Sequence, residues 1–338
     1  MFDLEQFCQN IFGKGFDEIK EKINKEDYSS FVIPKKRGMR QIIALPKNSE
    51  LRRMQKLLLD KFFANYSLPI PAKGFAKHES YKNYLMPHMG ANYFLRIDIS
   101  NFFNSIKFEH VEELLKDLFV FMDKDEKSKV IDLIWDIVSY NDSIPQGGVT
   151  SPIISNLIFR KLDQRILKYC QLFDIEYTRY ADDLLFSSYE FNFMDKKWFL
   201  KKIKYILGSR KFRINYRKIK YGYKEISLNG FIVSNRDIRL SRSRLFDIRH
   251  IVSYIRNNED AKRKDKCLLG INNLRFKHYD IEKYPFKSYY RVIQFLCGYR
   301  SFIISWIDDC IPNIANQKKL RKLVNEIEKA INILSEYI

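Results

Sequence analysis

Three carboxylates in two apolar segments have the types and spacing that favour metal-dependent chemistry. Asp98 lies inside the β-prone run 95–99, and Asp182 and Asp183 stand side by side between apolar runs 84 positions further on. Adjacent acids in a tight turn repel each other unless a cation neutralises them. Mg²⁺ prefers one or two carboxylates together with phosphate oxygens and water. The pattern therefore predicts that carboxylates from two neighbouring strands hold two Mg²⁺ ions for in-line phosphoryl transfer.

The pair Asp182-Asp183 could instead be an ordinary turn, because Asp is common in turns. Its context favours a catalytic role. Tyr180-Ala181-Asp182-Asp183 resembles the Tyr-x-Asp-Asp box of reverse transcriptases, and Leu95 to Ile106 resembles their first catalytic box. Ile144 to Pro152, with its Pro-Gln-Gly sequence, resembles the box between them. The order and spacing of the boxes also agree, and the resemblance covers roughly residues 28–235.

The resemblance implies roles for individual residues. Asp98, Asp182 and Asp183 become catalytic residues and metal ligands, and the backbone carbonyl of Ile99 becomes a further ligand. Phe103 is expected to lie under the incoming sugar and to exclude a 2′-OH. The expected nucleotide-binding residues are Lys36, Arg40, Phe103, Gln146 and Lys218.

Each of these residues also has a plainer interpretation. Phe103 could be a core residue, although alternation along a strand would send Phe102 and Phe103 to opposite faces, one to the core and one to the gate. The basic turn 35–40 could be a solvated charge run. The Gly-Gly loop around Gln146 could be a surface loop, and Lys218 one surface lysine among many.

A second set of residues resembles the retron branch of the family. Residues 74–80 and 87–92 resemble the retron insertion, in which His88 matches a family histidine and is expected to bind RNA. Tyr84 and Leu85 depart from the usual Asn-Ala, and Leu228-Asn229-Gly230 matches the usual Val-Thr-Gly only at its glycine. These departures leave the priming chemistry open. His88 could instead be a core histidine, and Gly230 a bulge glycine.

Hydrophobic periodicity and the resemblance together predict an α+β fold of the right-hand polymerase type, with fingers, an antiparallel palm sheet and a helical thumb. We expect N-terminal helices and fingers over 1–95 and a palm over 96–235 that includes finger helices at about 107–165. Residues 236–338 are expected to form a basic thumb, in which a helix over 241–257 turns its arginines outward to RNA. The arginines in question are Arg242, Arg244 and Arg249, for which a solvated basic face is the alternative.

The composition agrees with a polyanionic partner. The chain has 338 residues, 60 Lys and Arg against 41 Asp and Glu, and a net charge of +19, together with 27 Phe and 21 Tyr. Such a chain is folded rather than disordered, and nucleic acid is its expected partner ahead of a membrane surface. The N-terminus does not read as a signal peptide, no apolar run approaches a membrane span, and the five cysteines are scattered. A cytoplasmic protein with reduced thiols is therefore expected.

The resulting hypothesis is an RNA-directed DNA polymerase of retron type that works with two Mg²⁺ ions and dNTPs. It would copy part of a structured noncoding RNA into single-stranded DNA joined to RNA (msDNA), beside an effector protein encoded nearby, in antiviral defence. The main alternative is a non-retron defence-associated or intron-type reverse transcriptase with different priming. A catalytically silent RNA-binding scaffold is the alternative of another class, against which the intact aspartates argue.

Overall fold

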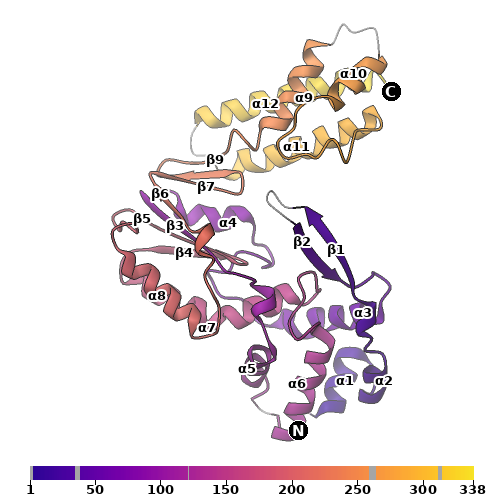
Figure 1. Cartoon of the computed structure of the whole chain (residues 1–338), viewed down its shortest axis with the longest axis vertical. Helices are drawn as coiled ribbons and strands as arrows, with labels where there is room; N and C mark the ends of the chain where they lie inside the picture. Colours follow the sequence, from indigo (N-terminus) through magenta and orange to yellow (C-terminus); the bar gives the residue numbers. More distant parts are fainter. Residues whose placement is uncertain (1–2, 35–38, 121, 259–263, 311–313) are drawn as a thin grey trace. The chain divides into compact units, whose positions relative to one another are not determined.

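The computed structural model describes residues 3–34, 39–120, 122–258, 264–310 and 314–338 (Figure 1). The structure combines helices with antiparallel pairs of strands, which confirms the predicted α+β class. The chain divides into two compact units, the first made of residues 1–87 and 95–221 and the second of residues 88–94 and 222–338. The domain boundaries predicted from the sequence stay predictions.

The helices of the first unit come from the N-terminal and central parts of the chain. Their bounds are α1 (Leu4–Phe12), α2 (Phe16–Glu21), α3 (Glu50–Leu57), α4 (Tyr81–Leu85), α5 (Phe108–Leu118), α6 (Lys124–Val138), α7 (Ser151–Gln171) and α8 (Lys197–Gly208). α7 packs against both β4 and α8 (Figure 1). The apolar face of α8 buries Phe199, Ile203, Ile206 and Leu207, as its helical periodicity predicts. Trp198, which the same periodicity was expected to turn inward, is 44% exposed, so that part of the prediction is wrong.

The strands form two sheets. β1 (Ser29–Pro34) and β2 (Met39–Ala44) make an antiparallel pair in which Phe31 lies opposite Ile42. The larger sheet has the order β4-β5-β3-β6-β7-β8-β9. Its strands are β3 (Tyr93–Asp98), β4 (Glu176–Tyr180), β5 (Asp183–Ser188), β6 (Lys220–Tyr223), β7 (Glu225–Leu228), β8 (Phe231–Ser234) and β9 (Ile238–Leu240).

The core of the first unit beneath β4 and β5 is aromatic. Tyr177 of β4 stacks on Phe186 of β5 at 5.0 Å between ring centroids, and Phe186 meets Phe199 of α8 edge to face at 5.3 Å. Aromatic pairs at these separations add to the gain from burying their area. Every residue of β5 is buried, so this strand is held firmly from both faces.

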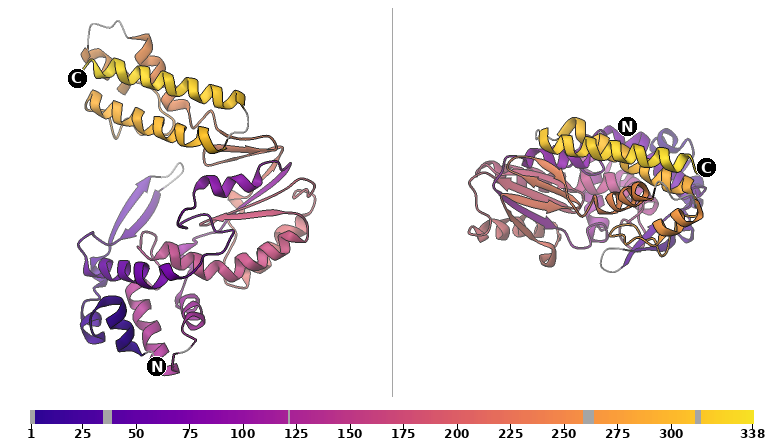
Figure 2. Two further views of the ribbon diagram at one scale, coloured as in Figure 1. Left: turned by 180° about the vertical axis from the view of Figure 1, so that it is seen from behind. Right: turned by 90° about the horizontal axis from the view of Figure 1, so that it is seen from above.

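The second unit contains helices that pack on one another, consecutive helices α9 with α10 and α11 with α12, and α9 also with the sequence-distant α12 (Figure 2). Their bounds are α9 (Phe246–Asn257), α10 (Lys264–Asn272), α11 (Tyr289–Cys310) and α12 (Ile314–Ser335). The apolar residues at and just before α9, namely Leu245, Ile248, Ile251, Val252 and Ile255, are all buried. The helix begins at Phe246 rather than at residue 241, because residues 242–245 form a turn.

Among the residues that the structure describes, no helix has both the length and the apolar character needed to cross a membrane.

Candidate active site

The turn between β4 and β5 presents the paired aspartates. Tyr180 and Asp183 are opposite one another at the end of the antiparallel ladder, so Ala181 and Asp182 alone make the turn. Ala181 adopts a φ of 55°, in the left-handed region that tight hairpin turns require. The turn places Asp182 at its tip, whereas Asp183 begins the buried strand β5.

A backbone hydrogen bond brings Asp98 beside this turn. The amide of Ile99, the residue after Asp98, donates to the carbonyl of Asp182 at 2.9 Å. The amide of Asn215 donates to the carbonyl of Asp98 at 2.8 Å and fixes the end of β3 from its other side. Two segments that are 84 positions apart in the sequence thus meet at one end of the sheet, as their boxes predict.

Two cations face two of the three carboxylates. Arg96 donates to both oxygens of Asp183, with Nη2 at 2.5 Å from Oδ1 and 2.7 Å from Oδ2. Lys218 Nζ lies 3.0 Å from Oδ1 and 2.8 Å from Oδ2 of Asp98. The Lys218 side chain is 53% exposed, whereas that of Asp98 is 4% exposed, so the lysine reaches the buried acid from the solvent side. Within the described part of the chain, Asp182 makes no ion pair.

Burial and like charge change the acidity of the pair. Burial is the largest cause that raises the pKa of Asp182 to about 6, and the charges of Asp183 and Asp98 raise it further. Burial likewise raises the pKa of Asp183, but Arg96 opposes this shift. Negative charge is therefore least favourable at Asp182. A cation bound to this carboxylate would offset the cost of ionising it.

The chemistry of these side chains fits a hard divalent cation, since all three donors are carboxylates gathered by the backbone at one edge. In the structure, two of these carboxylates are ion-paired, Asp183 with Arg96 and Asp98 with Lys218. No group of three or more His, Cys, Asp or Glu side chains among the described residues is arranged as a ready metal site. The metal roles predicted for Asp98, Asp182, Asp183 and the Ile99 carbonyl stay predictions.

A buried ion pair supports the hairpin formed by β4 and β5. Arg179 of β4 is fully buried and donates to Asp163 of α7, with Nη2 at 2.7 Å from Oδ2. The hydroxyl of Tyr177 donates to the same carboxylate at 2.7 Å, and Arg179 also donates to the Ala181 carbonyl at 3.1 Å. Because every member of this buried network has partners, it fixes the turn in one conformation.

Gly74 and Phe75 lie against the turn and against Tyr180 at the end of β4. A Cβ atom at Gly74 would lie 2.7 Å from the backbone nitrogen of Ala181, so only glycine permits this approach. The ring of Phe75 lies 6.2 Å from that of Phe103 and 6.3 Å from that of Tyr180. Sequence reasoning gave no role to Phe75 or Arg96, although both stand in segments that it singled out.

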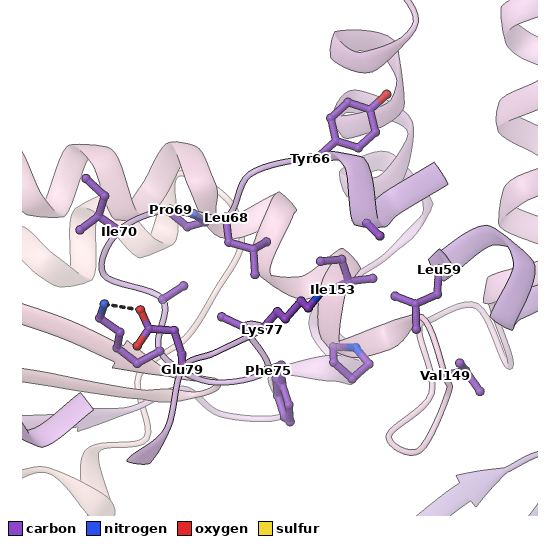
Figure 3. A pocket seen from close by; sticks show the side chains of 15 residues that line it. Leu59, Tyr66, Leu68, Pro69, Ile70, Phe75, Lys77, Glu79, Val149 and Ile153 are labelled. Carbon is purple, nitrogen blue, oxygen red and sulfur yellow. Dashed lines mark hydrogen bonds and ion pairs between the residues drawn. The ribbon is translucent and has the colours of Figure 1, made fainter. Parts of the chain in front are cut away.

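Phe75 also lines a cavity of about 700 Å³, which opens between the segment 59–79 and the start of α7. Figure 3 shows Leu68, Phe75, Lys77, Glu79 and Ile153 around this hollow. Glu79 is ion-paired with Lys73, which also lines the cavity. The cavity is largely apolar with lysines at its margin.

Phe102 and Phe103 differ in burial but not for the reason that the sequence suggested. Phe102 is 4% exposed and packs on Phe159 and Phe212, whereas Phe103 is half-buried and contacts Phe75. The prediction that strand alternation separates them is wrong, because β3 ends at Asp98 and Phe103 begins a 3-10 turn, Phe103–Ser105. The sugar-gate role of Phe103 stays a prediction.

The Pro-Gln-Gly loop is tied to β2. The amide of Ile43 donates to the Gln146 carbonyl at 3.0 Å, and the Val149 amide donates to Gln55 Oε1 at 3.1 Å. A Cβ atom at Gly147, whose φ is 126°, would lie 2.6 Å from the Ile43 carbonyl oxygen. Arg40 lies exposed on β2, and Lys36 lies outside the described residues. The nucleotide-binding roles of Arg40, Lys36 and Gln146 are not tested by these contacts.

The predicted RNA-binding residues fall into different environments. His88 is completely buried, and burial lowers its pKa to about 3. This burial fits the core interpretation, and the RNA-binding role of His88 stays a prediction. Arg242 and Arg249 are exposed. Arg244 is only half-exposed, because its guanidinium lies 5.2 Å from the ring centroid of Phe302.

Comparison with known proteins gives one family. Residues 23–233 match the family model described as reverse transcriptase (RNA-dependent DNA polymerase). The chain is 30% identical to the retron Ec86 reverse transcriptase of Escherichia coli over 68% of this chain and 70% of that relative. It is 30% identical to the retron Mx65 reverse transcriptase of Myxococcus xanthus over 47% of this chain and 40% of that relative. Among solved structures, a telomerase from Candida albicans in complex with a fragment of telomeric RNA is 12% identical, with a TM-score of 0.48, over 92% of this chain and 65% of that one.

Proposed function

The chain belongs to the retron-type reverse transcriptases, and from this premise we propose that it copies part of a partner noncoding RNA into single-stranded DNA that stays joined to RNA. Its reaction class is RNA-directed DNA polymerisation. The meeting of Asp98 with the Asp182-Asp183 turn carries the proposal, because it gathers the carboxylates that phosphoryl transfer needs. A 2′-OH primer in the partner RNA, an effector protein and a role in anti-phage defence in the cytoplasm belong to the same proposal.

Divalent metal dependence is general in this family. We propose two Mg²⁺ ions held by Asp98, Asp182 and Asp183 with the Ile99 carbonyl. When bound, they would activate the attacking hydroxyl oxygen and neutralise charge on the phosphate.

The chain's own residues prepare the site for this chemistry. The Arg179–Asp163 pair and the glycine at position 74 hold the turn so that Asp182 is presented at its tip. Arg96 orients Asp183 through three hydrogen bonds, and Lys218 orients Asp98 through two. Lys218 is exposed enough to exchange its partner for a nucleotide phosphate, which supports its proposed place in the nucleotide pocket.

The decisive variant is Asp182→Asn, because Asp182 is the one aspartate of the three that pairs with no cation in the described structure. We expect primer extension on an RNA template, followed with a labelled DNA primer and Mg²⁺, to fall at least a thousandfold. RNA binding should change little, since affinity depends mainly on phosphate contacts. The matched control is Asp195→Asn, an exposed acid before α8. Normal extension by Asp182→Asn would refute the proposed site.

A further inference from the structure

An unbroken basic segment follows the catalytic hairpin. Residues 196–224 contain 12 Lys and Arg and no Asp or Glu. The segment covers α8 and the 3-10 turn Tyr216–Lys218. Some of its cations are used within the fold, such as Lys218 with Asp98 and Arg210 with Glu113. The lysines of α8 make no ion pair among the residues that the structure describes, so their charge is available to a ligand.

Three of these lysines line one groove. Lys197, Lys201 and Lys204 are exposed, and their spacing of four and three residues places them on one face of α8. They span about 10 Å along the helix axis. The groove has a volume of about 470 Å³, and Leu200 forms part of its floor.

Two aromatic residues line the same groove. Tyr216 is 56% exposed and Tyr221 is half-buried, and both line the groove. Lys204 Nζ lies 5.8 Å from the centroid of the Tyr216 ring. A row of cations beside open aromatic faces is the combination by which proteins hold unpaired nucleotides, with phosphates on the cations and bases on the rings.

We propose that the groove between α8 and the turn Tyr216–Lys218, named here the α8 groove, binds a single-stranded segment of nucleic acid outside the catalytic centre. Its phosphates lie along Lys197, Lys201 and Lys204, and a base stacks on Tyr216. Charge complementarity selects a polyanion, and the exposed ring favours a strand with unpaired bases over an acidic protein or a lipid surface. The turn Tyr216–Lys218 borders the groove and also carries Lys218, which pairs with Asp98 in the candidate active site. A strand bound in the groove would therefore approach or leave that site along the face of the larger sheet that α8 covers.

The test compares two triple variants of the full-length protein. K197Q/K201Q/K204Q removes the lysines of the α8 groove, and K56Q/K116Q/K124Q removes three exposed lysines elsewhere in the first unit. Binding of a labelled 20-mer of oligo(dT), and separately of oligo(U), is measured from 0.05 to 0.5 M salt. We expect the first variant to lower the log–log salt slope by about two and the second to leave it unchanged.

A photocrosslink locates the strand without any substitution. A 5-iodouridine oligonucleotide irradiated with the unmodified protein should crosslink to Tyr216 or Tyr221, as mapped by mass spectrometry. Tyr216→Leu should remove that crosslink and weaken binding roughly tenfold. A preference between oligo(dT) and oligo(U) would tell whether the product DNA or the partner RNA is the occupant.

Several results would overturn the proposal. The first is an equal log–log salt slope for the two triple variants. The second is that all crosslinks map to residues outside the α8 groove. The third is that K197Q/K201Q/K204Q loses binding to anionic phosphatidylserine vesicles but keeps its binding to oligonucleotides. Primer extension on saturating template–primer should be normal in K197Q/K201Q/K204Q. Absence of extension in the unmodified protein would count against the proposed function and not against the α8 groove.

Discussion

At the scale of single residues, the aspartates and Lys218, the partner of Asp98, were identifiable from their motifs, whereas Arg96, the partner of Asp183, was not. Asp98, Asp182 and Asp183 stand in short motifs that can be read along the chain. Arg96 and Phe75 act through contacts across strands and loops, with Asp183 and with Phe103 respectively. Which strand lies beside which is decided by tertiary pairing, so no local pattern could have selected these two residues.

Phe103 provides a test of sugar selection. We expect Phe103→Ala to reduce the preference for dNTP over rNTP by about tenfold or more, because a pocket wall beneath the sugar would be lost. Single-nucleotide incorporation with each substrate measures the ratio. Phe102→Leu is the control, since Phe102 is buried in the core and should affect stability but not the ratio. An unchanged ratio for Phe103→Ala would make Phe103 a packing residue only.

His88 should make the protein sensitive to acid. Burial lowers its pKa from 6.5 to about 3, so the unfolded chain binds a proton that the folded chain excludes between these values. The free energy of unfolding is therefore unaffected by His88 titration above pH 6.5. As the pH falls from 6.5 toward 3, this free energy decreases by up to about 1.4 kcal/mol per pH unit. Urea unfolding from pH 7 to 4.5 should show a shallower pH dependence for His88→Gln. Identical slopes would contradict the assignment.

At the scale of elements, helices and strands with clear periodicity were predicted well, and turns within strands were not. Residues 227–233 have the apolar, β-prone pattern of one strand, but Asn229 and Gly230 have φ values of 46° and 92° and turn the chain between β7 and β8. The Asn-Gly pair is the local signal for such a hairpin. Residues 212–215 have a similar strand pattern but contribute only the bridge between Ile214 and Ile99.

The contact of Gly74 with the turn between β4 and β5 gives a prediction for these elements. Gly74→Ala should push the loop away from Ala181 and Tyr180 and lower primer extension at least tenfold, because the nearest atoms belong to the backbone and cannot move aside. Gly208→Ala is the matched control, since a Cβ atom there meets nothing within 4 Å. Extension assays together with thermal unfolding separate a displaced turn from a misfolded one. Equal activities for the two variants would refute the positioning role of Gly74.

At the scale of the whole molecule, the right-hand polymerase fold and the polyanionic partner were predictable, and the distribution of charge was misjudged. The family match confirms the fold that the boxes predicted. The net charge of +19 pointed to nucleic acid, and the segment 236–338 drew attention because its excess of basic residues is large. The acid-free segment 196–224 is more strongly basic, and counting charges by broad domains concealed it.

Of the three arginines predicted to bind RNA, Arg242 and Arg249 remain the candidates to test. Arg242→Gln/Arg249→Gln should weaken binding of a structured RNA and lower its log–log salt slope by somewhat under two, because both side chains are exposed. Arg244 is left intact, since it packs on Phe302 and its loss would disturb the fold. Filter binding across a salt series measures the slope. A slope equal to that of the unmodified protein would place the RNA elsewhere.

The two-stranded sheet of β1 and β2 has a consequence for local opening. Its apolar side chains Phe31, Val32, Ile33 and Met39 are between 43% and 71% exposed, and an isolated strand pair is marginally stable in water. Its amide protons should exchange with deuterium far sooner than those of the wholly buried strand β5. Because the Ile43 amide is bonded to the Gln146 carbonyl, any ligand that settles on the Gly-Gly loop should slow exchange in β2 as well. Deuterium uptake along residues 39–44 would thus report occupancy of the nucleotide pocket without any catalytic turnover.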